Sequence, residues 1–243
     1  MAKLVQKSGY IKSGKASGYM RYIATREGVE KLAGNGSVTK GQRELIQKLL
    51  TDFPDAVELF EYEDYCKTPT LGTASAFITM ALDANLHGID SESGYMQYIA
   101  TRPRVQKYGS HGLFSSATAV DIASAMSELE AHEGNVWTII YSLRREDAAR
   151  LEFDNADAWR TLLMENAPTL AKSMKISLDN FHWYAAFHDE GHHPHIHMMV
   201  WSDDPKEGFL TKDGIAAMRS KLTNAIFRDE MQQIYERKDV AYS

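Results

Sequence analysis

The chain has 243 residues, of which 44% are hydrophobic and 25% charged, as in an ordinary folded globular protein. No stretch approaches the roughly 18 apolar residues of a membrane span, and the lysine-containing N-terminus lacks the apolar run of a secretory signal. The single cysteine, Cys66, excludes an internal disulfide and fits a reducing cytoplasm.

Positive charge is concentrated near the N-terminus, although the net charge of the chain is -6. Residues 1–48 carry ten Lys and Arg against three Asp and Glu, a balance of +7, whereas residues 49–95 carry one Lys against nine acids, a balance of -8. A basic block of this kind can bind the phosphates of nucleic acid despite the overall sign, and a solvated surface of mixed charge is the alternative. The candidate DNA contacts are Lys12, Lys15, Arg21 and Arg26.

The first half of the chain contains a repeated string. SGYMRYIATREGVEKL begins at Ser17 and SGYMQYIATRPRVQKY begins at Ser93, so the two copies are 76 residues apart. Two copies indicate a duplicated element, because a solenoid needs at least three units. Each copy predicts a helix, since two tyrosines and an arginine recur at i, i+3 and i+7 on one face. These residues are Tyr19, Tyr22 and Arg26 in the first copy and Tyr95, Tyr98 and Arg102 in the second.

The residues around the first copy predict a strand and then several helices. KLVQKSGYIK predicts a strand, and SGKAS after it predicts a turn. Thr39 and Gln42 have the form of a capping box, and the amphipathic GQRELIQKLL predicts the helix that follows. ELFEYEDY and TASAFITMAL predict further helices. Together these segments predict an inserted helical layer at about residues 39–92, between the two copies.

The second half predicts three strands and further helices. NVWTIIYSL is rich in β-branched and aromatic residues and predicts a buried strand. REDAARL and NADAWRTLLMEN predict helices, and we expect Pro168 to interrupt the helical pattern. FHWYAAFH and HIHMMVWS predict an antiparallel hairpin, because only the six residues Asp189–Pro194 connect them. A last helix is expected from about Lys212 to Arg237, and its lack of a clear stop suggests that the chain is the front part of a longer protein.

Histidines cluster in and around this hairpin. Five of the nine fall within ten residues, namely His188, His192, His193, His195 and His197. Alternate residues of a strand share a face, so His195 and His197 project together, and a short hairpin brings His188 beside His195. Three imidazoles that converge on one point, with a further position left open, are typical of a catalytic metal site.

The residues between these histidines have weaker predicted roles. We expect Asp189 and Glu190 to orient a ligand imidazole as hydrogen-bond acceptors, and His192 and His193 to be loop residues rather than ligands. Three imidazoles suit Mn²⁺, Zn²⁺, Co²⁺ or Ni²⁺. The alternative is a polar surface loop in which the run of histidines has no function.

HDEGHHPHIH, from His188 to His197, resembles the histidine–hydrophobe–histidine signature of HUH endonucleases, with a third histidine seven residues upstream of the pair. YIATREGVE, ELFEYEDY, NVWTIIYSLRREDAARL and WYAAFH are similar to the MobL family of mobilisation relaxases, and this resemblance covers nearly the whole chain. It implies an α+β fold, the HUH fold, with a central antiparallel sheet flanked by helices.

The resemblance also implies function. It implies a bound divalent ion, Mn²⁺ or Mg²⁺, and metal-dependent nicking and rejoining of one DNA strand at a plasmid transfer origin. The implied partners are single-stranded DNA at that origin and other relaxosome and secretion-system proteins, and the implied location is the bacterial cytoplasm.

A tyrosine nucleophile that keeps the 5′ end as a phosphotyrosine belongs to the same expectation. In similar relaxases the nucleophile follows the first strand, and Tyr22 matches that place. Tyr98 is its repeat partner and lies nearer in sequence to the histidines, so it is the second candidate. Tyrosines at helical spacing are otherwise explained by packing. Weaker candidates are Tyr19, Tyr95 and, for a histidine nucleophile, His111 and His192.

Three other functions are open at this stage. HPHIHMM also resembles the triad of HIT nucleotide hydrolases, in which a histidine attacks phosphate without a metal, but this chain is long for that fold. A rolling-circle replication initiator shares the HUH chemistry and is a closer alternative. A non-enzymatic DNA-binding module stabilised by a metal is the third. Covalent adduct formation with single-stranded DNA separates the nucleases from the hydrolase and the module.

Overall fold

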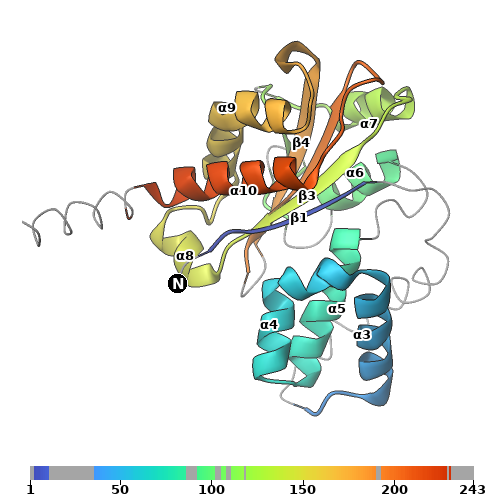
Figure 1. Ribbon diagram of the computed structural model, residues 1–243, viewed down its shortest axis with the longest axis vertical. Coiled ribbons are helices and arrows are strands. Elements are labelled where there is room, and N and C mark those ends of the chain that lie inside the picture. The colour runs from blue at the N-terminus through green and yellow to red at the C-terminus, as the bar shows by residue number, and fades with distance from the viewer. Residues whose placement is uncertain are drawn as a thin grey trace, which may run out of the picture.

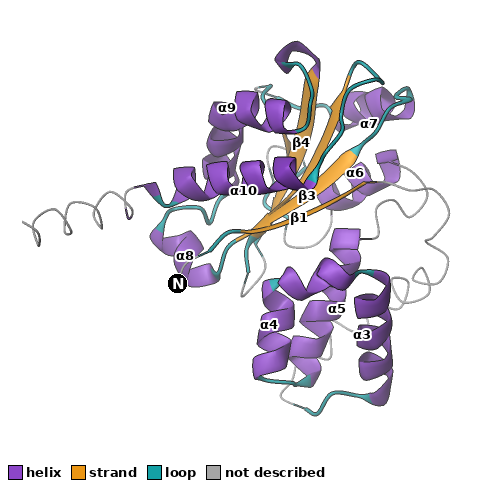
Figure 2. Ribbon diagram, in the orientation of Figure 1, coloured by secondary structure: helices purple, strands orange, loops and turns teal. Residues whose placement is uncertain are grey.

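The computed structural model of the chain describes residues 3–10, 36–85, 92–101, 105–107, 111–117, 119–189, 193–228 and 230. In these residues a five-stranded antiparallel sheet is flanked by helices on both faces (Figures 1 and 2). This confirms the α+β fold that the resemblance implies.

The strands are β1 (Val5–Tyr10), β2 (Leu113–Phe114), β3 (Trp137–Ser142), β4 (Phe181–His188) and β5 (His195–Ser202). Their order across the sheet is β1-β3-β5-β4-β2, and every neighbouring pair is antiparallel. β4 and β5 form the predicted hairpin, and β5 is the central strand. The strands predicted from KLVQKSGYIK and NVWTIIYSL are confirmed as β1 and β3.

The helical elements of the first half are α3 (Lys40–Asp52), the 3-10 helix η1 (Pro54–Glu58), α4 (Phe60–Lys67), α5 (Leu71–Asn85) and α6 (Glu92–Thr101). Those of the second half are α7 (Ile122–Glu130), α8 (Arg145–Arg150), α9 (Ala156–Ser173), the 3-10 helix η2 (Leu178–Asn180) and α10 (Lys212–Ile226). The predicted capping box is confirmed, because Thr39 and Gln42 each accept a hydrogen bond from the other's backbone N–H at the start of α3. α6 contains the second copy of the repeat, whereas the first copy lies outside the described residues.

Helix α9 continues through Pro168, so the predicted interruption there is wrong. Proline removes the hydrogen bond to the carbonyl four residues earlier, which is that of Met164. Pro168 and Met164 are both exposed, so water can bond this carbonyl and the helix loses little by carrying the proline. The predicted last helix is confirmed as α10 from Lys212 to Ile226, and most of its predicted continuation to Arg237 lies outside the described residues.

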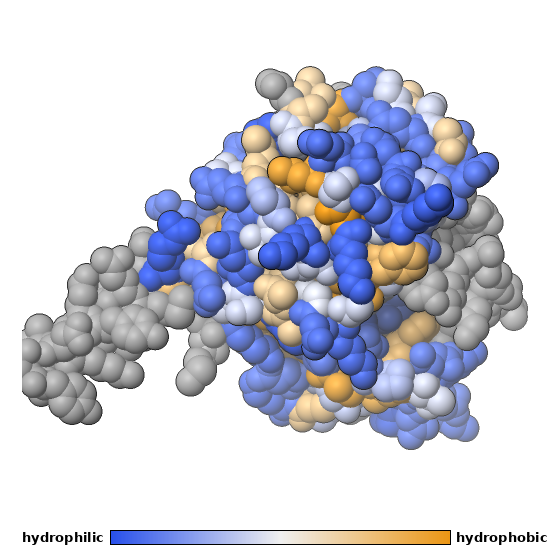
Figure 3. Space-filling view, turned by 45° about the horizontal axis from the view of Figure 1, so that its top comes forward, coloured by the Kyte–Doolittle hydropathy of each residue, from blue (hydrophilic) through white to orange (hydrophobic). Residues whose placement is uncertain are grey.

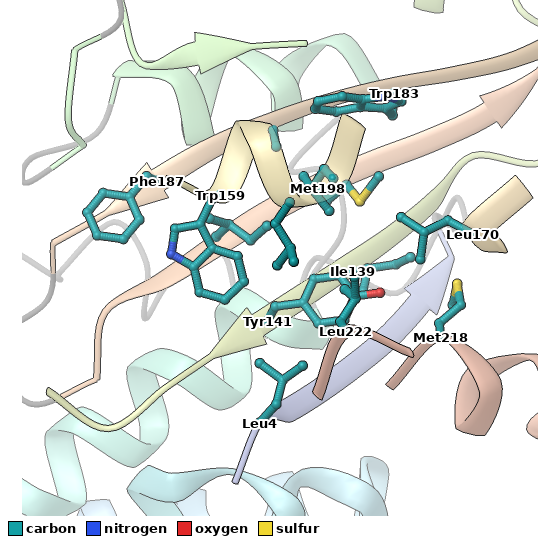
Figure 4. Packing of buried hydrophobic residues seen from close by; sticks show 14 of the residues in the cluster. Leu4, Ile139, Tyr141, Trp159, Leu170, Trp183, Phe187, Met198, Met218 and Leu222 are labelled. Atoms are coloured by element: carbon teal, nitrogen blue, oxygen red, sulfur yellow. The ribbon is translucent and has the colours of Figure 1, made fainter. Parts of the chain in front are cut away.

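One face of the sheet is covered by α9 and α10 (Figures 1 and 4). Residues that stand opposite one another on neighbouring strands project to the same face, so the register assigns each side chain to a face. The side chains that the sheet buries on this face include Ile139, Tyr141, Trp183, Phe187, Ile196 and Met198. They pack against Trp159 and Leu170 of α9 and Met218 and Leu222 of α10.

The opposite face carries His188, His195 and His197, and we call it the histidine face. Two separate hydrophobic clusters cover it. Val5 and Ile140 pack against the helices between residues 40 and 85. Further along the strands, Met199 and Trp201 pack in a second cluster that includes residues of α6 and α7. The histidine face is thus covered by one helical group at each side, α3–α5 and α6–α7 (Figure 1).

Apolar side chains are sparse on the surface that Figure 3 shows, where they form small separate patches among hydrophilic residues. Within the part of the chain that the structure describes, no helix is long and apolar enough to cross a membrane.

Candidate metal centre

Three buried histidines meet at one end of the central hairpin. His188 ends β4 and stands directly opposite His195, which begins β5, and His197 lies two residues further along β5. All three side chains are fully buried. Their ring centroids are 4.6–5.2 Å apart, and each ring offers a nitrogen within 4.8 Å of the other two. The structure therefore brings together the three histidines that the strand pattern selects.

Two backbone carbonyls orient the rings. His188 Nε2 lies 2.9 Å from the carbonyl oxygen of Ile99, and His195 Nδ1 lies 3.0 Å from that of His193. A carbonyl oxygen only accepts hydrogen bonds, so these nitrogens carry the protons and leave lone pairs on His188 Nδ1 and His195 Nε2. Those two atoms and His197 Nε2 are buried nitrogens. Neutral imidazoles in this state are suitable ligands for a divalent ion.

His193 is a connecting residue, as expected, but it is buried and anchored. It is 5% exposed, its Nε2 lies 2.7 Å from Asp64 Oδ2, and its ring stacks on Phe60. Burial alone would raise the pKa of Asp64, but the hydrogen bond from His193 and the charge of Arg144 outweigh burial and lower it. Asp64 is therefore ionised near neutral pH and accepts the proton that His193 Nε2 donates.

The predicted role of Asp189 is wrong. Its carboxylate forms an ion pair with Arg145 at 2.6 Å, and the acceptors that orient His188 and His195 are backbone carbonyls instead. These carbonyls are held by α6 and by the hairpin connection, which are better fixed than an exposed carboxylate. Glu190 and His192 lie outside the described residues.

Most of the predicted catalytic and DNA-binding residues lie outside the described residues: Tyr22, Lys12, Lys15, Arg21 and Arg26, together with Tyr19 and Arg102. Tyr98 belongs to α6, although its side chain and that of Tyr95 are not described. The carbonyl that orients His188 comes from Ile99, the next residue after Tyr98. The second copy of the repeat thus lies against the three converging histidines.

Two tyrosines of the sheet and the weaker candidate His111 have environments that do not favour attack on a phosphate. Tyr141 projects to the opposite face of the sheet, and burial raises its pKa far above the ordinary value. Burial and the neighbouring carboxylate of Glu128 raise the pKa of Tyr184 to about 12. His111 uses both ring nitrogens in the fold, one on the carbonyl of Val120 and the other on the N–H of Leu113.

Asp64 was not predicted from the sequence. It is 129 residues from His193, and it lies in the acidic string ELFEYEDY, which is typical of a solvated helix face. No local pattern distinguishes the carboxylate that reaches a buried histidine from its acidic neighbours.

The fold is α+β, with an antiparallel sheet whose central hairpin carries three converging histidines. This arrangement is expected of a metal-binding HUH nuclease. A family model described as MobL relaxases matches residues 1–242, so the chain belongs to the MobL relaxase family. It is therefore a relaxase, a DNA-binding nuclease that nicks DNA in plasmid mobilisation. Searches of curated proteins and of solved structures found no match.

Proposed function

We propose that this relaxase cuts one strand of single-stranded DNA at a plasmid transfer origin in a metal-dependent reaction, and that it later rejoins the strand. The observation that carries this proposal is the convergence of three buried imidazoles, at least two of them with lone pairs left available by backbone acceptors. Buried polar groups are costly unless they are hydrogen-bonded or coordinate a metal, and a divalent ion would stabilise three imidazoles that meet at one point. The family match supplies the substrate class, DNA.

His188, His195 and His197 would hold the divalent ion. Mn²⁺ or Mg²⁺ is the ion we propose, and the imidazole donors also suit Zn²⁺, Co²⁺ and Ni²⁺. Bound there, the ion would polarise the scissile phosphate and offset the charge that develops on it. The burial of the histidines excludes water from their ring nitrogens, and the two carbonyl acceptors fix the ring orientation of His188 and His195 and the nitrogen that carries the proton.

Tyr22 is the proposed nucleophile, with Tyr98 as the second candidate. The tyrosine oxygen forms a bond to phosphorus while the bond from phosphorus to the 3′ oxygen breaks. The tyrosine proton leaves to a base or water, and the 3′ oxygen gains a proton and becomes a free hydroxyl. The protein then holds the 5′ phosphate as a phosphodiester, and this bond keeps the free energy needed for rejoining.

The position of β1 is compatible with Tyr22. Lys7 of β1 stands in the same row across the sheet as His197, with Ile140 of β3 between them. The chain leaves β1 at Tyr10, and the twelve following residues can span about 40 Å when extended. Tyr10 lies five residues along the strand from the row of His195, a distance of about 17 Å. The connection is long enough for Tyr22 to reach the metal centre.

Formation of a covalent adduct tests this function. The full chain, incubated with a labelled origin oligonucleotide and Mn²⁺, should give a DNA–protein band that survives a denaturing gel. A chelator added before the DNA should prevent the band, because the metal ion would be removed. The assay should be repeated with Mg²⁺, Zn²⁺, Co²⁺ and Ni²⁺. A DNA complex that is lost on denaturation with every one of these ions would instead indicate a DNA-binding module without nicking activity.

We also propose that Lys12, Lys15, Arg21 and Arg26 bind DNA phosphates. Each phosphate contact to a single strand contributes about -0.7 to the slope of log affinity against log salt concentration. Replacing all four residues by glutamine should weaken binding at low salt and reduce this slope by up to about 3. Fluorescence anisotropy with a labelled oligonucleotide over a range of salt concentrations measures both effects.

A second set of four replacements controls for the loss of positive charge itself. The control residues, exposed and outside the basic N-terminal block, are Lys172, Lys206, Lys212 and Lys221. Their replacement by glutamine should leave the slope almost unchanged. Equal slopes for the two quadruple variants would exclude the N-terminal segment as the DNA-binding surface.

The remaining proposals concern organisation and context. We propose that the chain forms one nicking domain in which residues of about 39–92 are an inserted helical segment. Single-stranded DNA at the origin is the proposed substrate, and other relaxosome and secretion-system proteins are the proposed partners. The bacterial cytoplasm is the proposed location.

A further inference from the structure

The inserted helices contact the proposed metal centre at His193. Asp64, in the last turn of α4, accepts a hydrogen bond from His193 in the connection between β4 and β5. Phe60, one turn earlier on the same helix, stacks on the His193 ring with centroids 5.2 Å apart. One helix therefore fixes both the edge and the face of this imidazole.

His193 forms a hydrogen bond directly with the proposed metal ligand His195. The carbonyl oxygen of His193 accepts the hydrogen bond from His195 Nδ1, and this bond determines which nitrogen of His195 carries the proton. The next carbonyl, that of Pro194, accepts from the N–H of Leu143 and ties the connection to the end of β3. The orientation of the His193 carbonyl thus depends on the contacts of the His193 side chain and on the backbone hydrogen bond of Pro194.

We propose that Asp64 is a positioning residue for the metal ligand His195, acting through His193. Asp64 holds the His193 side chain, His193 in turn presents its carbonyl to His195 Nδ1, and His195 Nε2 is thereby kept as a ligand. This inference rests on the proposed metal site. It makes the inserted helices part of the metal centre, although they contribute no ligand to it.

Docking of the helices does not itself depend on Asp64. Phe60 and Phe77 belong to the cluster that packs on Val5 and Ile140 of the sheet. Lys7 of β1, which is 4% exposed, forms a separate ion pair with Asp55 of η1. Removing the Asp64 carboxylate should therefore leave the helices on the sheet, release the edge of the His193 ring and weaken the contact with Arg144.

Glu63 is the matched control, because it is the neighbouring carboxylate on the same helix. It also pairs with Arg144, at 3.1 Å, as Asp64 does at 3.3 Å. Its other recorded ion pairs are with Lys3 and Lys67, whereas the recorded carboxylate partner of His193 is Asp64. Glu63→Ala and Asp64→Ala thus remove the same charge and weaken the same arginine contact, but only the second variant releases His193.

The test is titration of the metal-free full chain with Co²⁺, followed by calorimetry and by the visible absorption of the bound ion. Asp64→Ala should weaken Co²⁺ binding by about tenfold and change the absorption spectrum, because orienting partners of ligands typically contribute at least this factor. Glu63→Ala should bind Co²⁺ as the wild type does. Asp64→Asn keeps an oxygen acceptor, so its affinity should stay within about threefold of the wild type.

A double-mutant cycle identifies the route. His193→Ala should show the same loss as Asp64→Ala, and the double variant should lose no more than either single one, because the two residues act in series. Thermal unfolding of the metal-free variants shows that each is folded, and Asp64→Asn provides the comparison if Asp64→Ala is not.

Three results would overturn the proposal. The first is an unchanged Co²⁺ affinity and spectrum in Asp64→Ala, and the second is an equal loss in Glu63→Ala. The third is an additive loss in the double variant. If the folded wild type binds no Co²⁺, the proposed metal site fails as well. If the wild type binds Co²⁺ and His197→Ala does not, the metal site stands. An unchanged Co²⁺ affinity in Asp64→Ala then contradicts only the positioning role of Asp64.

Discussion

His197→Ala should bind no divalent ion measurably and should form no nicked product, while the protein stays folded. The imidazole of His197 is one of only three proposed ligands, and its Nε2 is a buried atom in the convergent set. Loss of a ligand should exceed the roughly 100-fold upper range for loss of an outer partner. Calorimetry with Mn²⁺ and a nicking assay on a labelled oligonucleotide measure the two losses separately, and circular dichroism confirms the fold.

The matched control is His182→Ala. His182 lies on β4 and on the same face of the sheet as His188, but it pairs with Asp203 and stacks on Trp201 at the other end of the strand. This variant should retain metal binding and nicking. If His197→Ala binds the ion as tightly as His182→Ala does, the three histidines are not the ligands and the proposed metal centre is wrong.

Tyr22→Phe should bind DNA and metal but form no covalent adduct. The change removes only the hydroxyl oxygen, so the packing of the ring is kept and the bond to phosphorus cannot form. Loss of the adduct should be complete, because phenylalanine has no oxygen that can attack phosphorus. The measurement is the denaturing gel described above, followed by mass spectrometry of the peptide that carries the nucleotide.

Tyr98→Phe is the control for this prediction, and it also tests Tyr98 as the alternative nucleophile. Its helix, α6, contacts the metal centre through the carbonyl of Ile99, so this variant should lose some rate but still form the adduct. An adduct in Tyr22→Phe and none in Tyr98→Phe would assign the chemistry to the second copy of the repeat. An adduct in both variants would show that neither tyrosine is the nucleophile, and the mapped peptide would then identify the attacking residue.

The hairpin and its histidines were predictable because they depend on local information. A six-residue connection between two apolar strands requires antiparallel pairing, and alternation along β5 projects His195 and His197 to one face. The same local rules predicted the cap at Thr39, where both partners lie within one helical turn. Pro168 shows the limit of these rules. The free-energy cost of a proline in a helix depends on whether water can reach the carbonyl that loses its hydrogen bond, and this depends on the tertiary fold.

The groups that orient the ligands could not be predicted in this way. Ile99 is 89 residues from His188, and Asp64 is 129 residues from His193. Which carbonyl or carboxylate reaches a given ring depends on how whole helices pack on the sheet. Asp189 adjoins His188 in sequence and was therefore the obvious acceptor, yet the fold directs it to Arg145. Proximity along the chain did not predict the acceptor, because the group that accepts from His188 belongs to a helix packed on the sheet.

The separation between the three proposed ligands and the groups that orient them has a consequence for folding. All three histidines lie within ten residues, so the loop that must close to bring them together is short and closes at small entropic cost. The contacts from Ile99 and Asp64 have high contact order and should form late. An ion could therefore meet the hairpin early on the folding pathway but would be held tightly only after both helical groups have packed. Tight binding of the ion would then report that the chain has completed its fold.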